Sequence, residues 1–112
     1  MVYQRGDVLL VPFPFSDLST TKVRPALVVS SSVYHASEPD LLLAAVTSNL
    51  AGAKSVVDYR LQDWQAAGLR YPSAFKPVIF TLDPARVLHR VGAISETDLS
   101  AIDQRLRLIF AL

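Results

Sequence analysis

The sequence predicts a small, mainly β domain in which short strands form a twisted barrel closed by one C-terminal helix. Two observations carry this prediction. Short apolar, β-branched runs alternate with turns rich in Gly, Pro and polar residues, and a helical period appears strongly only near the C-terminus. The links between the runs are too short for parallel βαβ units. The 112 residues therefore predict a single domain, residues 1–112.

Six apolar runs are predicted to be strands. The first is apolar at nearly every position, as expected of a strand covered on both faces. Because proline removes a ladder donor, Pro12, Pro14 and Pro77 each require an edge strand or a bulge. The predicted strands are residues 8–13, 25–31, 41–46, 55–59, 74–82 and 86–91.

Two helices are predicted. Asp63 can cap a brief internal helix over residues 64–67 that ends at Gly68, with Trp64 packing it onto the barrel rather than stacking on a base. Ser95 opens a capping box, and the apolar residues after it recur at helical spacing to the C-terminus. The turn-rich segment 31–40 is interpreted as a loop that could hold one helical turn.

Composition excludes several classes of protein. The chain is 51% hydrophobic, which argues against disorder, and it has no cysteine for disulfides or thiolate metal sites. Its two histidines stand alone without ligand spacing, and His89 is interpreted as a half-exposed strand residue rather than a general base. No apolar run approaches the roughly 20 residues that span a bilayer, and no signal-peptide pattern is present, so a cytoplasmic location is expected. The net charge of +1 means that any nucleic-acid binding must come from local clustering.

Two polar clusters stand where apolar runs begin or end. Arg24 precedes Pro25, which holds it in extended backbone at the mouth of a strand. Thr47, Ser48 and Asn49 follow another strand directly. Both clusters have an ordinary structural interpretation, as solvated loop charges and as turn residues that bond nearby backbone. Together they place a cation and hydroxyl groups at the ends of predicted strands.

The ordered set of motifs resembles the MazF/PemK toxins along nearly the whole chain. The matching segments are Arg5-Gly6-Asp7-Val8, Arg24-Pro25-Ala26 with the strand after it, Thr47-Ser48, Gly68-Leu69 with Pro72-Ser73, and the run from Arg86 to Gly92 before the final helix. The resemblance implies an SH3-like barrel of the MazF/PemK/CcdB type that forms a homodimer. It also implies a metal-independent, sequence-specific endoribonuclease that acts on single-stranded mRNA without a cofactor. A cognate antitoxin with an acidic C-terminal tail is the implied protein partner.

The resemblance assigns the catalytic pair to Arg24 and Thr47. Arg24 suits binding of the phosphate and stabilisation of its added charge, and Thr47 suits orientation of the phosphate. The general base is open: Asp17 is the only carboxylate in the loop before Arg24 and is the candidate. RNA contacts are expected from Thr21, Lys22, Ser48, Asn49 and Lys76. The alternative is a non-catalytic SH3-like binding module, or a relative that poisons a protein target such as gyrase.

Overall fold

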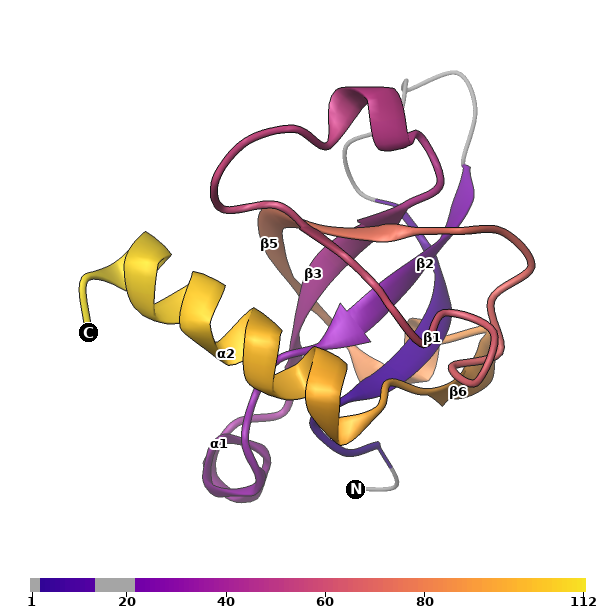
Figure 1. Cartoon of the computed structure of the whole chain (residues 1–112). Coiled ribbons are helices and arrows are strands. Elements are labelled where there is room, and N and C mark those ends of the chain that lie inside the picture. Colours follow the sequence, from indigo (N-terminus) through magenta and orange to yellow (C-terminus); the bar gives the residue numbers. More distant parts are fainter. Residues whose placement is uncertain (1–2, 14–21) are drawn as a thin grey trace.

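The described part of the chain folds as a curled antiparallel sheet of six strands with a long helix against its outer face (Figure 1). The description rests on a computed structural model and covers residues 3–13 and 22–112. The strands lie in the order β4-β5-β3-β2-β1-β6. They are β1 (Asp7–Pro12), β2 (Val23–Val28), β3 (Leu41–Thr47), β4 (Tyr59–Arg60), β5 (Ala74–Leu82) and β6 (His89–Ala93). The mainly β fold predicted from the sequence is confirmed.

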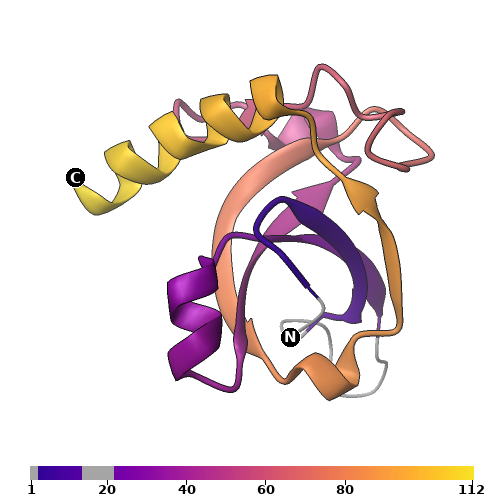
Figure 2. The ribbon, with the colours of Figure 1, turned by 90° about the horizontal axis from the view of Figure 1, so that it is seen from below.

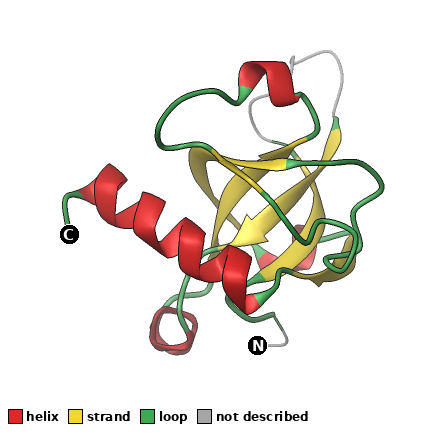
Figure 3. Ribbon diagram, viewed as in Figure 1, coloured by secondary structure: helices red, strands yellow, loops and turns green. Residues whose placement is uncertain are grey.

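The helical elements lie between and after the strands (Figure 3). Within the described residues they are the helices α1 (Ser32–Ser37) and α2 (Glu96–Phe110) and the short 3-10 turns η1 (Leu50–Gly52) and η2 (Pro84–Arg86). The predicted C-terminal helix is confirmed: the Ser95 hydroxyl accepts a hydrogen bond from the Asp98 N–H. In these same ranges, 3–13 and 22–112, no helix combines the length and apolar character needed to cross a bilayer.

The curl of the sheet creates two hydrophobic cores, one on each face. In Figure 2 the strands bend around an interior, and α2 lies outside them. Leu9 and Val11 of β1 belong to the inner core, whereas Val8 packs in the outer core together with Ile102 of α2. Strand β1 is therefore covered on both faces, as its continuous apolar run predicted.

Prolines fall where the ladder can tolerate a missing donor. At Pro77 the register of β3 with β5 shifts between Ala44 and Ala45, so the predicted bulge is confirmed. The prediction for Pro12 is wrong, because β1 is no edge strand and lies between β2 and β6. Pro12 is tolerated as the last residue of β1, beyond Leu10, the last residue paired with β6. Pro14 lies outside the described residues.

Several predicted elements differ from the structure. Residues 64–67 form a turn rather than a helix, because Gly68 at φ +87° ends the segment before a helical nucleus can propagate. The short internal helix is instead α1, in the segment interpreted as a loop, where Ser31 caps the N–H of Tyr34. The predicted strand 55–59 shrinks to Tyr59–Arg60, and the strand predicted from residue 86 begins at His89 because η2 takes up Pro84–Arg86.

The open side between β4 and β6 is covered by close backbone packing rather than by a strand ladder among the described residues. A Cβ built on Gly92 would meet the Ala67 carbonyl oxygen at 2.3 Å, and one built on Gly68 would meet the Val91 carbonyl oxygen at 2.4 Å. Only glycine allows the backbones to approach this closely. The turn at 64–68 is thereby held against β6, and Trp64 packs on the outer core as predicted.

A buried carboxylate ties α2 to the same turn. Asp98 is fully buried and accepts hydrogen bonds from the Tyr59 hydroxyl (2.6 Å), the Gln62 N–H (3.0 Å) and the Asp63 N–H (2.9 Å). Burial and the bond to Asp98 raise the pKa of Tyr59 from 10.0 to about 12. The Arg105 guanidinium lies 5.1 Å from the centre of the Tyr59 ring. Helix α2 therefore fixes the path of the chain between β4 and β5.

Candidate functional site

A groove of about 820 Å³ opens at the end of the sheet where β2 begins and β3 ends. Its described lining comes from four strands, from the turn after β3 and from the segment between residues 68 and 73. The lining residues are Leu10, Val23, Arg24, Pro25, Val46, Thr47, Ser48, Asn49, Gly68, Leu69, Arg70, Tyr71, Ser73, His89 and Val91.

The sheet register explains why Arg24 and Thr47 meet at this groove. Ala26 of β2 pairs with Ala45 of β3 in an antiparallel ladder. Arg24 lies two residues before Ala26, and Thr47 lies two residues after Ala45, so both fall at the same end of the same strand pair. The cation and the hydroxyl that the sequence singled out therefore line one groove.

Arg24 has an exposed guanidinium. Its Nη1 donates to the carbonyl oxygen of its neighbour Val23 at 3.2 Å, the one side-chain hydrogen bond recorded for it within the described residues. A guanidinium has five N–H donors in a planar fork, so most of them remain available to a phosphate. Pro25 follows in β2 and holds the backbone of Arg24 extended.

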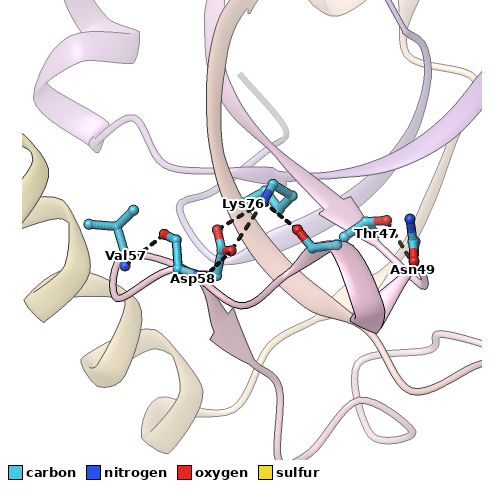
Figure 4. A network of polar contacts seen from close by, with 7 residues as sticks. Thr47, Asn49, Val57, Asp58 and Lys76 are labelled. Carbon is cyan, nitrogen blue, oxygen red and sulfur yellow. Dashed lines mark hydrogen bonds and ion pairs between the residues drawn. The ribbon is translucent and has the colours of Figure 1, made fainter.

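Thr47 ends β3 with its hydroxyl tied to the following turn. The Thr47 Oγ1 accepts a hydrogen bond from the Asn49 N–H at 3.0 Å, which fixes the side chain at the groove (Figure 4). The hydroxyl keeps its own hydrogen, so it can still donate to a bound anion. Ser48 and Asn49 are both exposed and also line the groove.

Lys76 serves a different part of the molecule from the one predicted. Its Nζ lies 3.1 and 3.2 Å from the two carboxylate oxygens of the buried Asp58 and 3.0 Å from the Gly52 carbonyl oxygen (Figure 4). These contacts use the three ammonium hydrogens, and Lys76 does not belong to the described lining. The lysine therefore fastens the segment after β3 to β5.

The remaining predicted site residues are distributed as follows. Lys22 is exposed immediately before β2, next to Val23 at the groove, but it is not among the described lining residues. Thr21 and Asp17 lie outside the described residues. In the ranges 3–13 and 22–112, no group of three or more His, Asp or Glu side chains is arranged to hold a metal ion.

The sequence analysis did not assign three groove residues to the site: it did not single out Arg70 and Tyr71, and it interpreted His89 as a half-exposed strand residue rather than a general base. Arg70 and Tyr71 belong to the segment between β4 and β5, whose position depends on contacts far along the chain. His89 could have been found only from the pairing of β6 with β1. The described lining carries two arginines and no carboxylate, so it favours an anionic ligand with hydrogen-bond acceptors.

Comparison of the sequence with protein-family models identifies the family of this chain. The family model described as "PemK-like, MazF-like toxin of type II toxin-antitoxin system" matches residues 4–110. The chain belongs to the PemK/MazF toxin family. None of the curated proteins matches the sequence significantly.

Solved structures of PemK/MazF toxins share the fold. An endoribonuclease from a mycobacterial species, solved with its cognate antitoxin, superposes with a TM-score of 0.79 at 15% identity, covering 99% of this chain and 97% of that one. MazF from Deinococcus radiodurans, in a MazE–MazF structure, gives 0.77 at 18% identity over 100% and 99% of the two chains. The toxin MazF-mt6 of Mycobacterium tuberculosis gives 0.74 at 15% identity over 95% and 97%. These matches confirm the predicted MazF-like barrel fold.

Proposed function

We propose that this PemK/MazF toxin is an endoribonuclease that cleaves single-stranded mRNA at specific sequences without a metal ion. The observation that carries the proposal is that Arg24 and Thr47 line one open groove. The similar structures described as endoribonucleases support the same activity.

The proposed chemistry is attack of a ribose 2′-hydroxyl on its own 3′-phosphate. The 2′-oxygen forms a bond to phosphorus, the bond to the 5′-oxygen of the next nucleotide breaks, and the products carry a 2′,3′-cyclic phosphate and a 5′-hydroxyl. Arg24 would bind the non-bridging oxygens and stabilise the charge that grows on them. Thr47 would donate a hydrogen bond that orients the phosphate.

The proposed partners follow from the charge of the groove. Arg24 and Arg70 line it and no Asp or Glu does so among the described residues, which suits both RNA and an acidic antitoxin tail. The similar structures of toxins bound to antitoxins support a cognate antitoxin as the protein partner. We expect a homodimer acting in the cytoplasm, where its mRNA substrate is found.

The test is cleavage of a long single-stranded RNA by the purified full-length toxin, freed of antitoxin, in the presence of EDTA. The wild type is expected to give fragments ending in 2′,3′-cyclic phosphate. Arg24→Ala is expected to lose on the order of 10² to 10³ in rate. The matched control is Arg107→Ala, which removes an exposed arginine of α2 outside the groove and is expected to cleave like the wild type.

Two outcomes would contradict the proposal. Intact RNA with a folded wild-type toxin would favour the non-catalytic binding module or the poison of a protein target. Cleavage that survives Arg24→Ala unchanged would show that the active site lies elsewhere.

A further inference from the structure

The floor of the groove contains a row of paired residues that ends at a histidine. Leu10 of β1 pairs with Pro25 of β2 on one side and with His89 of β6 on the other. Directly paired residues of antiparallel strands carry their side chains on the same face. Pro25, Leu10 and His89 accordingly all line the groove.

The row sets the spacing between His89 and Pro25, the residue that follows Arg24. Neighbouring strands lie about 4.8 Å apart, so the backbone of His89 lies about 10 Å from that of Pro25. Arg24 follows the alternation of strand side chains to the other face of β2, and it lines the same groove at the end of the strand, where both it and His89 are exposed. A ribose-phosphate unit bound in the groove can therefore contact the guanidinium and the imidazole together.

The chemistry of the lining singles out the same residue. Cleavage through the 2′-hydroxyl needs a group that accepts its proton, and neither Arg24 nor Thr47 is a good base near neutral pH. The described lining holds no Asp or Glu, and His89 is its only side chain of a type that titrates between pH 5 and 8.

The ring of His89 is also available. The residue is exposed at the start of β6, and within the described part of the chain no hydrogen bond or ion pair is recorded for its ring. The other histidine, His35, is bonded to the Ser30 hydroxyl, away from the groove. His89 thus has free ring nitrogens in the place where a base is needed.

We propose that His89 is the general base that accepts the proton of the attacking 2′-hydroxyl. The inference rests on the proposed ribonuclease function and names a further catalytic residue for it. As the 2′-oxygen bonds to phosphorus, its proton passes to a neutral imidazole nitrogen. The bond to the 5′-oxygen breaks, that oxygen takes a proton from water, and the imidazolium then returns its proton to solvent.

The described charged and titratable groups near His89 belong to the groove lining, to β1 and to β6 with the residues just before it. Arg24 belongs to β2, and Arg70 and Tyr71 belong to the segment between β4 and β5. On β1 the nearest such group is the buried Asp7, which is already paired with Arg90 of β6 at 3.1 Å. Arg86 lies just before the strand. Among these described groups, no unpaired carboxylate competes for the proton.

The test measures kcat and KM against pH for the full-length toxin with an RNA oligonucleotide that the wild type cleaves. The wild-type kcat is expected to fall as pH falls between about 8 and 5, because imidazolium cannot accept a proton. His89→Ala and His89→Gln are expected to lose on the order of 10² in kcat and to lack that acid limb. Added imidazole is expected to restore part of the His89→Ala rate. His35→Gln is the matched control and should retain the limb.

The outcomes separate this inference from the proposed function. If the wild type does not cleave RNA, both are wrong. If it cleaves and the His89 variants keep the wild-type kcat and acid limb, His89 is not the base, whereas the ribonuclease proposal stands. A rise in KM alone would overturn the base role and leave His89 as an RNA contact. Because His89 is exposed, urea unfolding of both variants should match the wild type, so a lost rate cannot be attributed to unfolding.

Discussion

Replacing Asp98 with alanine is expected to destabilise the toxin far more than replacing a surface carboxylate of the same helix. Asp98 is fully buried and accepts three hydrogen bonds, from the Tyr59 hydroxyl and from the N–H groups of Gln62 and Asp63. Asp98→Ala removes all three acceptors at once. The phenol of Tyr59 is partly exposed and can turn to water, but the two backbone donors lose a fixed charged partner.

The magnitude follows from those two donors. A hydrogen bond to a charged group contributes about 1.5 to 3 kcal/mol, and a buried donor left unsatisfied costs about 1 to 3 kcal/mol. Loss of a negative charge in the first turn of α2 adds about 0.5 kcal/mol. We therefore expect Asp98→Ala to lower the free energy of unfolding by about 3 to 4 kcal/mol. Asp98→Asn should cost about 2 kcal/mol, since its amide keeps one acceptor oxygen but turns an NH₂ group toward a backbone donor.

The assay is equilibrium unfolding in urea followed by far-UV circular dichroism. Asp103→Asn is the matched control, because Asp103 pairs with Arg5 at the surface of the same helix, and it should cost less than about 1 kcal/mol. Hydrogen exchange at the amides of Gln62 and Asp63 should accelerate in Asp98→Ala before the rest of the sheet exchanges. An Asp98→Ala midpoint equal to that of the control would refute the reasoning.

Three further predictions concern the same framework. Gly92→Ala places a Cβ 2.3 Å from the Ala67 carbonyl oxygen, so it should cost about 2 kcal/mol in urea unfolding; an unchanged stability would contradict the close packing. Asp58→Asn breaks the ion pair with Lys76 and should lower the free energy of unfolding by about 2 kcal/mol. Adding Lys76→Met to the same chain removes the unpaired ammonium and should recover part of that free energy; no recovery would contradict the pairing. The pKa of Tyr59 is about 12 in the folded protein and 10.0 in the unfolded chain. Protonated Tyr59 therefore contributes to the free energy of unfolding in full below pH 10, and this contribution is lost as the pH rises through 12. Between pH 9 and pH 11.5 the free energy of unfolding should fall by about 1 kcal/mol after solvent screening. Urea unfolding at the two pH values measures this fall, which should be absent in Tyr59→Phe.

Local signals in the sequence predicted what depends on neighbouring residues. The apolar run of β1, the bulge at Pro77 and the cap at Ser95 follow from periodicity and from single-residue chemistry. The pairing of β2 with β3 then brought Arg24 and Thr47 to one groove, as the resemblance to the family implied. Their catalytic roles stay predictions until the variants are assayed.

Features that depend on distant contacts were not predictable in the same way. The sequence placed Asp98 only near the start of the predicted C-terminal helix, because its hydrogen-bond partners stand 35 to 39 residues earlier in the chain. Residues 64–67 were predicted to form a helix between the Asp63 cap and Gly68, but they form only a turn ending at Gly68, and the close approach of the Val91 backbone to Gly68 could not be read from the sequence. His89 appeared to be an ordinary strand residue until the register with Leu10 was known.

A series of contacts connects the C-terminal helix α2 to the wall of the groove. Asp98 fixes the N–H groups of Gln62 and Asp63, and the turn that follows them is held against β6 by its close contact with Gly92. The next residues, 68–73, make the groove wall that carries Arg70. Because each link is a hydrogen bond or a close backbone contact, we expect a change in α2 to reach the groove without altering any residue that lines it. Asp98→Asn should therefore weaken RNA binding more than the matched surface variant does, at urea-free conditions in which both remain folded.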